Sequence, residues 1–147
     1  MKEIVVNSLI ETQNLAKILA KKIENGMVIL LYGEIGAGKT TFTKFLLENL
    51  GVKSIVSSPT FTLLNEYDGV FPVYHFDMYR ISSEEELYEL GFEDYINSKS
   101  SPFVKTGLTL IEWPENVLKM LPKDAVSIKI EKLGETKRKF VIQNLDF

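Results

Sequence analysis

A glycine-rich run between an apolar segment and an amphipathic one constrains this chain more than any other feature. The run, Gly33-Glu34-Ile35-Gly36-Ala37-Gly38-Lys39-Thr40, matches the pattern G-x-x-x-x-G-K-[S/T]. The preceding Met27–Tyr32 is continuously apolar, which is typical of a strand buried on both faces. The following Thr41–Leu50 has apolar residues at helical spacing. This strand–loop–helix context predicts a loop that binds the phosphates of a nucleoside triphosphate.

The residue types in the run fit that chemistry. Gly36 and Gly38 allow the backbone to curl so that successive N–H groups point inward, and the helix that follows adds the positive end of its dipole. Lys39 supplies a charge for the β- and γ-phosphates, the Thr40 hydroxyl can ligate Mg²⁺, and Thr41 can reach the α-phosphate side. A tight turn alone explains one or two glycines, but not three followed by Lys-Thr. The loop residues expected to bind nucleotide are Gly33, Ile35, Gly36, Ala37, Gly38, Lys39, Thr40 and Thr41.

A phosphate-binding loop also requires a carboxylate near the metal ion, at the end of another buried strand. Asp77 follows Val73–Phe76, and Glu112 follows Leu108–Ile111. The carboxyl ends of parallel strands are where α/β sheets gather their ligands. Glu112 has the cleaner apolar strand before it, and it can bind Mg²⁺ directly or through water, or orient the attacking water. For each acid the alternative is a solvated carboxylate at a strand end.

Three further features have both a functional and an ordinary explanation. The hydroxyls of Ser57–Phe61, Thr60 among them, can contact the γ-phosphate or metal as a switch loop does, although Ser/Thr-Pro stretches are commonly turns. His75, the only histidine, is expected to be a hydrogen-bonded core residue rather than a metal ligand. Trp113 either packs in the core or forms a lid or partner contact at the mouth of the site.

The rest of the pattern alternates strands and helices. Lys2–Val6 reads as a strand, Ser8 or Thr12 can cap the next helix, and Asn25-Gly26 is expected to stop it. We expect the apolar face of this helix to comprise Leu15, Ala16, Ile18, Leu19 and Ile23. Two extended pieces, Phe61–Tyr67 and Val70–Phe76, flank the hairpin signal Asp68-Gly69.

The second half predicts two short helices, a loop and a final strand pair. Ser82 or Ser83 is expected to cap the first helix, Asp94–Asn97 to form the second, and Ser98–Thr106 to form a polar loop. The last strands, Ala125–Ile130 and Lys139–Ile142, turn around Gly134. We therefore predict an α/β fold, a P-loop NTPase-like three-layer sandwich whose mixed sheet has a parallel centre and antiparallel edge strands.

Composition limits the class of protein. The 147 residues suit one domain, 1–147, with 45% hydrophobic and 25% charged residues. The net charge of −3 provides no general attraction to DNA, so an RNA partner is expected to be held by another protein. There are no cysteines for disulfides or thiolate metal sites, and the N-terminal apolar run is shorter than a signal sequence or membrane span. These features predict a cytoplasmic protein.

Four motifs together resemble the TsaE family, formerly YjeE: Gly33–Thr41, Ser58–Leu63, His75–Arg80 and Ile111–Pro114. Members of that family are ATPase subunits of bacterial tRNA threonylcarbamoyladenosine synthesis. The resemblance implies ATP and Mg²⁺ as cofactors and weak hydrolysis by the protein alone. It implies association with TsaB and TsaD, of which TsaD holds the transferase centre that modifies adenosine 37. Contact with tRNA is then indirect, through a complex whose turnover ATP hydrolysis supports.

The resemblance also implies roles for individual residues. Lys39 and Thr40 correspond to phosphate and Mg²⁺ residues, Asp77 to an acid of the nucleotide site and Glu112 to the metal-linked acid. The further motif positions are Thr60, Tyr79, Arg80 and Trp113. Adenine contacts are implied near Leu9 and around Gly134, and Ser98–Thr106 is longer than usual for the family.

Two other functions were weighed against an ATPase subunit. A small-molecule kinase needs several cations to clamp the transferring group, and this chain has only two arginines, Arg80 and Arg138. A GTP-dependent binding switch needs an [N/T]-K-x-D segment to read guanine, and the nearest run, Pro122-Lys123-Asp124, lacks that pattern. Both observations favour the ATPase.

Overall fold

The computed structural model describes residues 1–96 and 106–147, and it alternates strands with helices as predicted. The strands are β1 (Lys2–Val6), β2 (Val28–Tyr32), β3 (Leu64–Asp68), β4 (Pro72–Asp77), β5 (Leu108–Glu112), β6 (Val126–Lys132) and β7 (Arg138–Gln143). The helices are α1 (Leu9–Ala20), α2 (Lys39–Asn49), α3 (Glu84–Glu89), α4 (Glu93–Ile96) and the short 3-10 turns η1 (Pro114–Asn116) and η2 (Leu118–Met120). None of the helices in the described part is long and apolar enough to cross a membrane.

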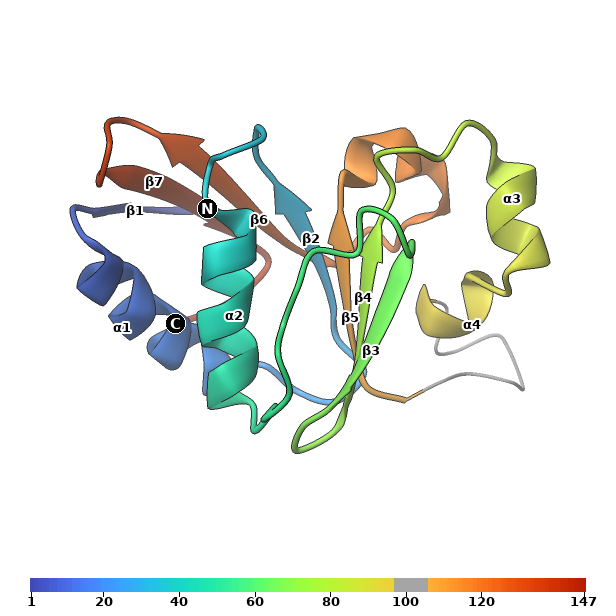
Figure 1. The fold of residues 1–147 in the computed structure, drawn as a ribbon, viewed down its shortest axis with the longest axis horizontal. Helices are drawn as coiled ribbons and strands as arrows, with labels where there is room; N and C mark the ends of the chain where they lie inside the picture. Colours follow the sequence, from blue (N-terminus) through green and yellow to red (C-terminus); the bar gives the residue numbers. More distant parts are fainter. Residues whose placement is uncertain (97–105) are drawn as a thin grey trace.

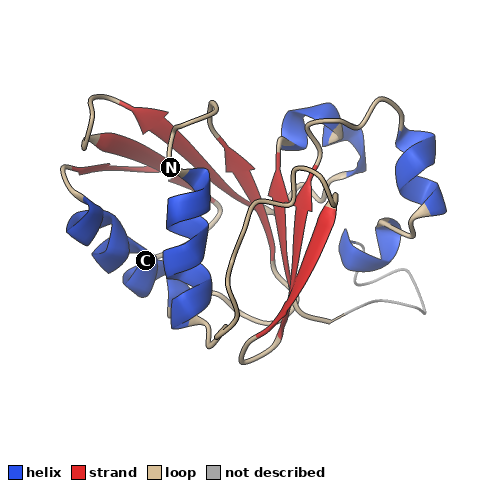
Figure 2. Cartoon of the chain, viewed as in Figure 1, coloured by secondary structure: helices blue, strands red, loops and turns tan. Residues whose placement is uncertain are grey.

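The strands form one mixed sheet in the order β1-β7-β6-β2-β5-β4-β3. The central strands β6, β2, β5 and β4 run parallel to one another, whereas β7 pairs antiparallel with β6 and β1, and β3 pairs antiparallel with β4. The predicted α/β fold with a parallel centre and antiparallel edges is therefore confirmed. Figures 1 and 2 show α1 and α2 on one side of the twisted sheet and α3 and α4 on the other.

Apolar side chains pack against both faces of the sheet. Ile29 and Leu31 join the cluster that contains the buried residues of α1 and α2. Their neighbours Val28 and Leu30 join a second cluster with Leu87 of α3. Because successive side chains of a strand point to opposite faces, a central strand covered on both sides must be apolar throughout. This explains the unbroken apolar run that precedes the glycine-rich loop.

The register places the ends of three parallel strands side by side. Leu31 of β2 pairs with Glu112 of β5, and Glu112 pairs with Asp77 of β4. The chain leaves β2 into the loop at Gly33, so this loop and the two acids occupy the same edge of the sheet. Parallel strands expose their carboxyl ends at one edge, which is the usual ligand edge of an α/β sheet.

Several predicted boundaries were wrong. The first helix ends at Ala20, before Asn25-Gly26, so Ile23 is buried beyond its end, and Ile18 is half exposed. Ser8 caps this helix by accepting from the Glu11 N–H, and Glu11 accepts in turn from the Asn7 N–H, which is a capping box that ties the helix start more firmly than Thr12 does.

The hairpin and the second short helix also shift. The hairpin strand β3 begins only at Leu64, because Pro59 accepts from the Thr62 and Leu63 N–H groups in a turn. The helix predicted at Asp94–Asn97 is observed as Glu93–Ile96. Asn97, and all but the last residue of the predicted Ser98–Thr106 loop, lie outside the described residues.

Candidate active site

The glycine-rich run forms a loop from the end of β2 to the start of α2. Gly36 and Gly38 have φ angles of 83° and 107°, a region that other residues rarely adopt. Gly38 is the N-cap of α2, and no side chain caps this helix start. The open N–H groups of α2 and the loop therefore point to the place where an anion is favoured.

Lys39 is the first residue of α2, and its side chain is held inside the site. Its ammonium lies 4.2 Å from the centre of the Trp113 ring. Burial lowers the pKa of Lys39, and the carboxylates of Glu112 and Asp77, followed by Glu115 and Glu34, oppose that shift. The neighbouring carboxylates favour the charged form of Lys39, and a partly desolvated ammonium attracts a phosphate more strongly than one in water does.

A cavity of about 360 Å³ brings together most of the predicted site residues; we call it the phosphate cavity. Its lining residues are Ile35, Gly36, Gly38, Lys39, Thr40, Thr41, Ser58, Thr60, Asp77, Glu112, Trp113 and Arg138. They come from the glycine-rich loop, the start of α2, the loop before β3, the ends of β4 and β5, and the start of β7. Arg138 is the member that the sequence did not predict as a site residue.

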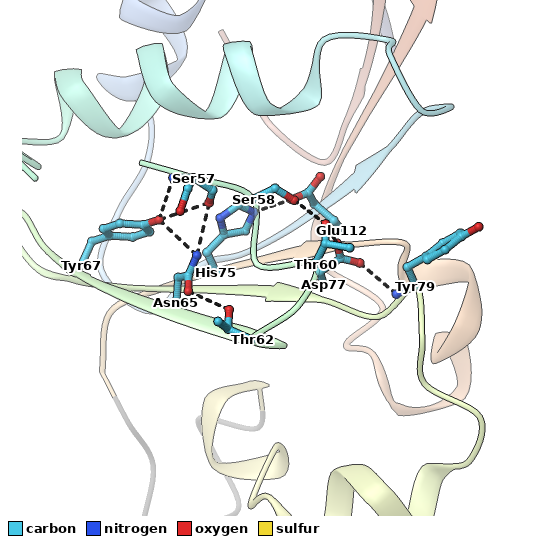
Figure 3. A network of polar contacts seen from close by, with 10 residues as sticks. All are labelled: Ser57, Ser58, Thr60, Thr62, Asn65, Tyr67, His75, Asp77, Tyr79 and Glu112. Atoms are coloured by element: carbon cyan, nitrogen blue, oxygen red, sulfur yellow. Dashed lines mark hydrogen bonds and ion pairs between the residues drawn. The ribbon is translucent and has the colours of Figure 1, made fainter. Parts of the chain in front are cut away.

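The two acids are buried and held by hydrogen bonds, which excludes the alternative of solvated strand ends. Glu112 is 3% exposed and Asp77 5% exposed. His75 Nε2 lies 2.7 Å from Glu112 Oε2, as Figure 3 shows. Asp77 Oδ1 accepts from the Tyr79 N–H at 2.9 Å, and Oδ2 accepts from the Thr60 hydroxyl at 3.1 Å.

His75 is a hydrogen-bonded core residue, as predicted. It is 1% exposed and bonds Glu112 from the neighbouring strand β4. Its other ring nitrogen, Nδ1, has no hydrogen-bond partner among the described residues. Within residues 1–96 and 106–147, the bond to Glu112 is therefore the one hydrogen bond that holds this ring, and its loss would leave both buried ring nitrogens unpaired, which is costly.

The Ser-Pro-Thr segment lies over the acids and is fixed to the sheet (Figure 3). Thr60 accepts a hydrogen bond of 2.7 Å from Ser58, since its own proton goes to Asp77. The start of the segment is anchored by Tyr67 of β3, whose hydroxyl accepts from the Ser57 N–H at 3.1 Å and donates to the Ser57 carbonyl at 3.3 Å. The structure thus places the Thr60 hydroxyl against Asp77, and contact of these hydroxyls with a phosphate or metal stays a prediction.

A second cavity, of about 200 Å³, adjoins the phosphate cavity and shares Gly38, Thr41 and Arg138 with it; we call it the apolar cavity. Its other lining residues are Ser8, Leu9, Thr12, Ala37, Ile130, Glu135, Thr136 and Phe140. Leu9, near which the family resemblance implies an adenine contact, lines this cavity. Gly134 does not line this cavity, although its neighbours Glu135 and Thr136 do.

The donor set of the phosphate cavity suits Mg²⁺ rather than a softer metal. Thr40, Asp77 and Glu112 supply hydroxyl and carboxylate oxygens, which Mg²⁺ prefers. Within residues 1–96 and 106–147 there is no cluster of three or more His, Cys, Asp or Glu residues that could hold a metal ion.

Sequence reasoning missed two pairings that tertiary structure creates. The Lys39 ammonium stacks on Trp113, and Arg138 donates from Nε to the Ala37 carbonyl at 2.8 Å. The sequence signal for Arg138 was weak, because one arginine in a strand is ordinarily a surface residue. Gly33 does not line the phosphate cavity; it lines a separate cavity of about 520 Å³, together with Tyr32.

Known proteins resemble this chain both in sequence and in structure. The family model described as "Threonylcarbamoyl adenosine biosynthesis protein TsaE" matches residues 6–140. A "tRNA threonylcarbamoyladenosine biosynthesis protein TsaE" of Bacillus subtilis is 42% identical over 129 residues, 87% of this chain and 76% of that protein. One of the same name from Rickettsia prowazekii is 38% identical over 144 residues, 97% and 94% of the two chains. The crystal structure of B. subtilis YdiB superposes with a TM-score of 0.73 at 34% identity, covering 96% of this chain and 83% of that one.

Proposed function

This chain belongs to the TsaE family of threonylcarbamoyl adenosine biosynthesis proteins, and from that membership we propose that it is an ATP-binding and ATP-hydrolysing subunit of tRNA threonylcarbamoyladenosine synthesis. The observation that carries the proposal is the phosphate cavity, where the lysine of a glycine-rich loop meets two buried carboxylates from adjacent strand ends. Such a cavity suits a triphosphate far better than it suits a neutral ligand.

The nucleotide would lie along the two adjoining cavities. We propose that its phosphates contact the loop from Gly33 to Thr41 and that its base enters the apolar cavity beside Leu9, near the turn at Gly134. The shared lining residues support this placement, because two cavities that have Gly38, Thr41 and Arg138 in common lie next to each other. The apolar walls suit a stacked base, and the glycine-rich loop suits its phosphates.

Four residues are proposed to act in hydrolysis: Lys39, Thr60, Asp77 and Glu112. Lys39 would neutralise charge on the β- and γ-phosphates. Glu112 is held through Oε2 by His75, which leaves Oε1 to orient an attacking water. Asp77 fixes the Thr60 hydroxyl beside the γ-phosphate position.

Thr40 and Glu112 are proposed to hold Mg²⁺, with Asp77 as the alternative to Glu112. Bound Mg²⁺ supplies positive charge to the β- and γ-phosphate oxygens as negative charge develops on them. The oxygen chemistry of these side chains, all on one cavity wall, supports the assignment.

We propose that the protein acts on a TsaB–TsaD complex, hydrolyses ATP weakly when alone, and contacts tRNA only through that complex. The proposal extends to a cytoplasmic location, to one ATPase domain over residues 1–147, and to a P-loop NTPase-like three-layer sandwich. Family membership supports the pathway, and the apolar clusters on both faces of the sheet support the three layers.

The decisive experiment measures phosphate release from ATP by the purified protein, with and without Mg²⁺ and with and without TsaB and TsaD. We expect slow Mg²⁺-dependent release that rises when both partners are present. A small-molecule kinase would instead transfer phosphate rapidly to an added acceptor, and a GTP-dependent switch would bind GTP more tightly than ATP. Either result would overturn the proposal.

A further inference from the structure

Arg138 joins two parts of the chain that lie far apart in sequence. It is the first residue of β7, and its Nε donates to the Ala37 carbonyl of the glycine-rich loop at 2.8 Å. Its Nη1 lies within hydrogen-bond distance of three carbonyls of the β6–β7 turn: Gly134 at 2.8 Å, Glu135 at 3.2 Å and Lys137 at 3.1 Å. One guanidinium therefore ties the loop to the turn.

The position of Arg138 relative to the two cavities gives this link a consequence. Arg138 lines both the phosphate cavity and the apolar cavity. Ala37, whose carbonyl it holds, is 2% exposed and also lines the apolar cavity. The turn that it holds contributes Glu135 and Thr136 to the lining of the same cavity. The guanidinium thus bonds both the loop and the turn that line this cavity.

The chemistry of the link favours arginine over lysine. A planar guanidinium donates from Nε and Nη1 in fixed directions at once, whereas an ammonium is a single point donor. No carboxylate forms an ion pair with Arg138 in the described part of the chain, so its bonds to carbonyls serve geometry rather than charge neutralisation. The Nη1 bonds also close the turn from which β7 departs, and the Leu133 N–H donates to the Lys137 carbonyl across it.

We propose that Arg138 is a positioning residue that holds the base-binding and phosphate-binding parts of the site at a fixed distance from each other. It holds the glycine-rich loop and the β6–β7 turn at one separation, so that a nucleotide engages both cavities together. The inference rests on the proposed function, since it assigns the two cavities to the two ends of one nucleotide. Its effect falls on the coupling between base and phosphates rather than on phosphate binding itself.

The test compares a nucleotide with a ligand that lacks the base. Calorimetry in the presence of Mg²⁺ measures the Kd of ATP and of inorganic tripolyphosphate for the wild type, Arg138→Lys and Lys139→Gln. Lys139 is the matched control because it neighbours Arg138 on β7. Its Nζ lies 3.7 Å from Glu3 Oε2, away from the cavities. We expect wild-type protein to bind ATP more tightly than tripolyphosphate, and Lys139→Gln to keep that ratio.

For Arg138→Lys we expect the Kd of ATP to rise about tenfold and that of tripolyphosphate to change less than about threefold, because the positive charge remains while the link is lost. An unchanged ratio of the two Kd values would overturn the inference. This covers a variant in which only the melting temperature falls, and a variant in which both ligands weaken equally because Arg138 acts on the phosphates alone. Wild-type protein that binds no ATP would overturn the proposed function itself.

Discussion

Replacing Glu112 by glutamine tests the proposed hydrolytic role with little disturbance of the fold. Glutamine has the same shape, and its side-chain oxygen can still accept the hydrogen bond that His75 Nε2 makes to Glu112 at 2.7 Å. Only the negative charge is lost. Because that charge is what would draw a proton from the attacking water or hold the metal ion, we expect ATP hydrolysis to fall by about 10²–10⁴-fold.

The expected magnitude follows from transition-state arithmetic. A fall of 10²–10⁴-fold corresponds to about 3–5 kcal/mol in the activation barrier, since about 1.36 kcal/mol is a factor of ten. Binding of ATP should change little, because the glycine-rich loop and Lys39 remain intact. We therefore expect a Kd for ATP within about threefold of the wild-type value, which is less than about 0.7 kcal/mol.

An alanine substitution at Glu112 would combine two effects, the loss of the negative charge and a loss of stability. Glu112→Ala removes the hydrogen-bond partner of the His75 ring, which is 1% exposed and has no other such partner in the part of the chain that the structure describes. Leaving such a group unpaired costs about 1–3 kcal/mol of stability, and each kcal/mol lowers the melting temperature of a domain near this size by about 2–4 °C. The glutamine variant should instead melt close to the wild type.

The assay combines phosphate release, calorimetric ATP binding and thermal melting on the same preparations. Asp77→Asn is the matched comparison. Both carboxylate oxygens of Asp77 accept hydrogen bonds, and an amide NH₂ in place of one oxygen cannot accept. We expect about a tenfold fall in turnover. Near-normal turnover of Glu112→Gln would refute the reasoning. So would loss of ATP binding in parallel with hydrolysis, since Glu112 would then act mainly in binding.

Three further outcomes are expected. Thr60→Val should slow hydrolysis and lower stability by about 1 kcal/mol through loss of the hydrogen bond to Asp77, whereas Thr60→Ser should restore both in phosphate-release and melting assays. Gly36→Ala should cost about 1–3 kcal/mol by denaturant unfolding and weaken ATP binding, because its φ of 83° is unfavourable for alanine while no atom would contact the new methyl within 4 Å; unchanged values would contradict this. Lys39 has a lowered pKa in the folded protein, so the unfolded chain binds more protons and stability should rise with pH as pH approaches the unfolded value of 10.5. Lys39→Met should lack that rise in unfolding titrations below about pH 10 and should lose ATP binding.

The sequence by itself determined the elements and the chemistry of the glycine-rich loop. An apolar run of strand length, three glycines and a following Lys-Thr constrain the local backbone and leave few alternatives, because the required φ angles and the buried strand depend on residues close in the chain. The same local reasoning identified Asp77 and Glu112 as acids at strand ends. Some boundaries were wrong: the first helix ends at Ala20, before Asn25-Gly26, and β3 begins only after the turn at Pro59.

Tertiary structure decided which of these residues meet. The parallel register sets Asp77 beside Glu112 and Glu112 beside β2, and the sequence contains no local signal for the partner of a strand. The bond from His75 to Glu112 spans 37 residues, and that from Arg138 to the Ala37 carbonyl spans 101. Such contacts are fixed by the packing of the whole sheet. The glycine-rich loop could therefore be recognised from the sequence, whereas the orientation of Asp77 and Glu112 and the bond from Arg138 to the loop depend on the fold.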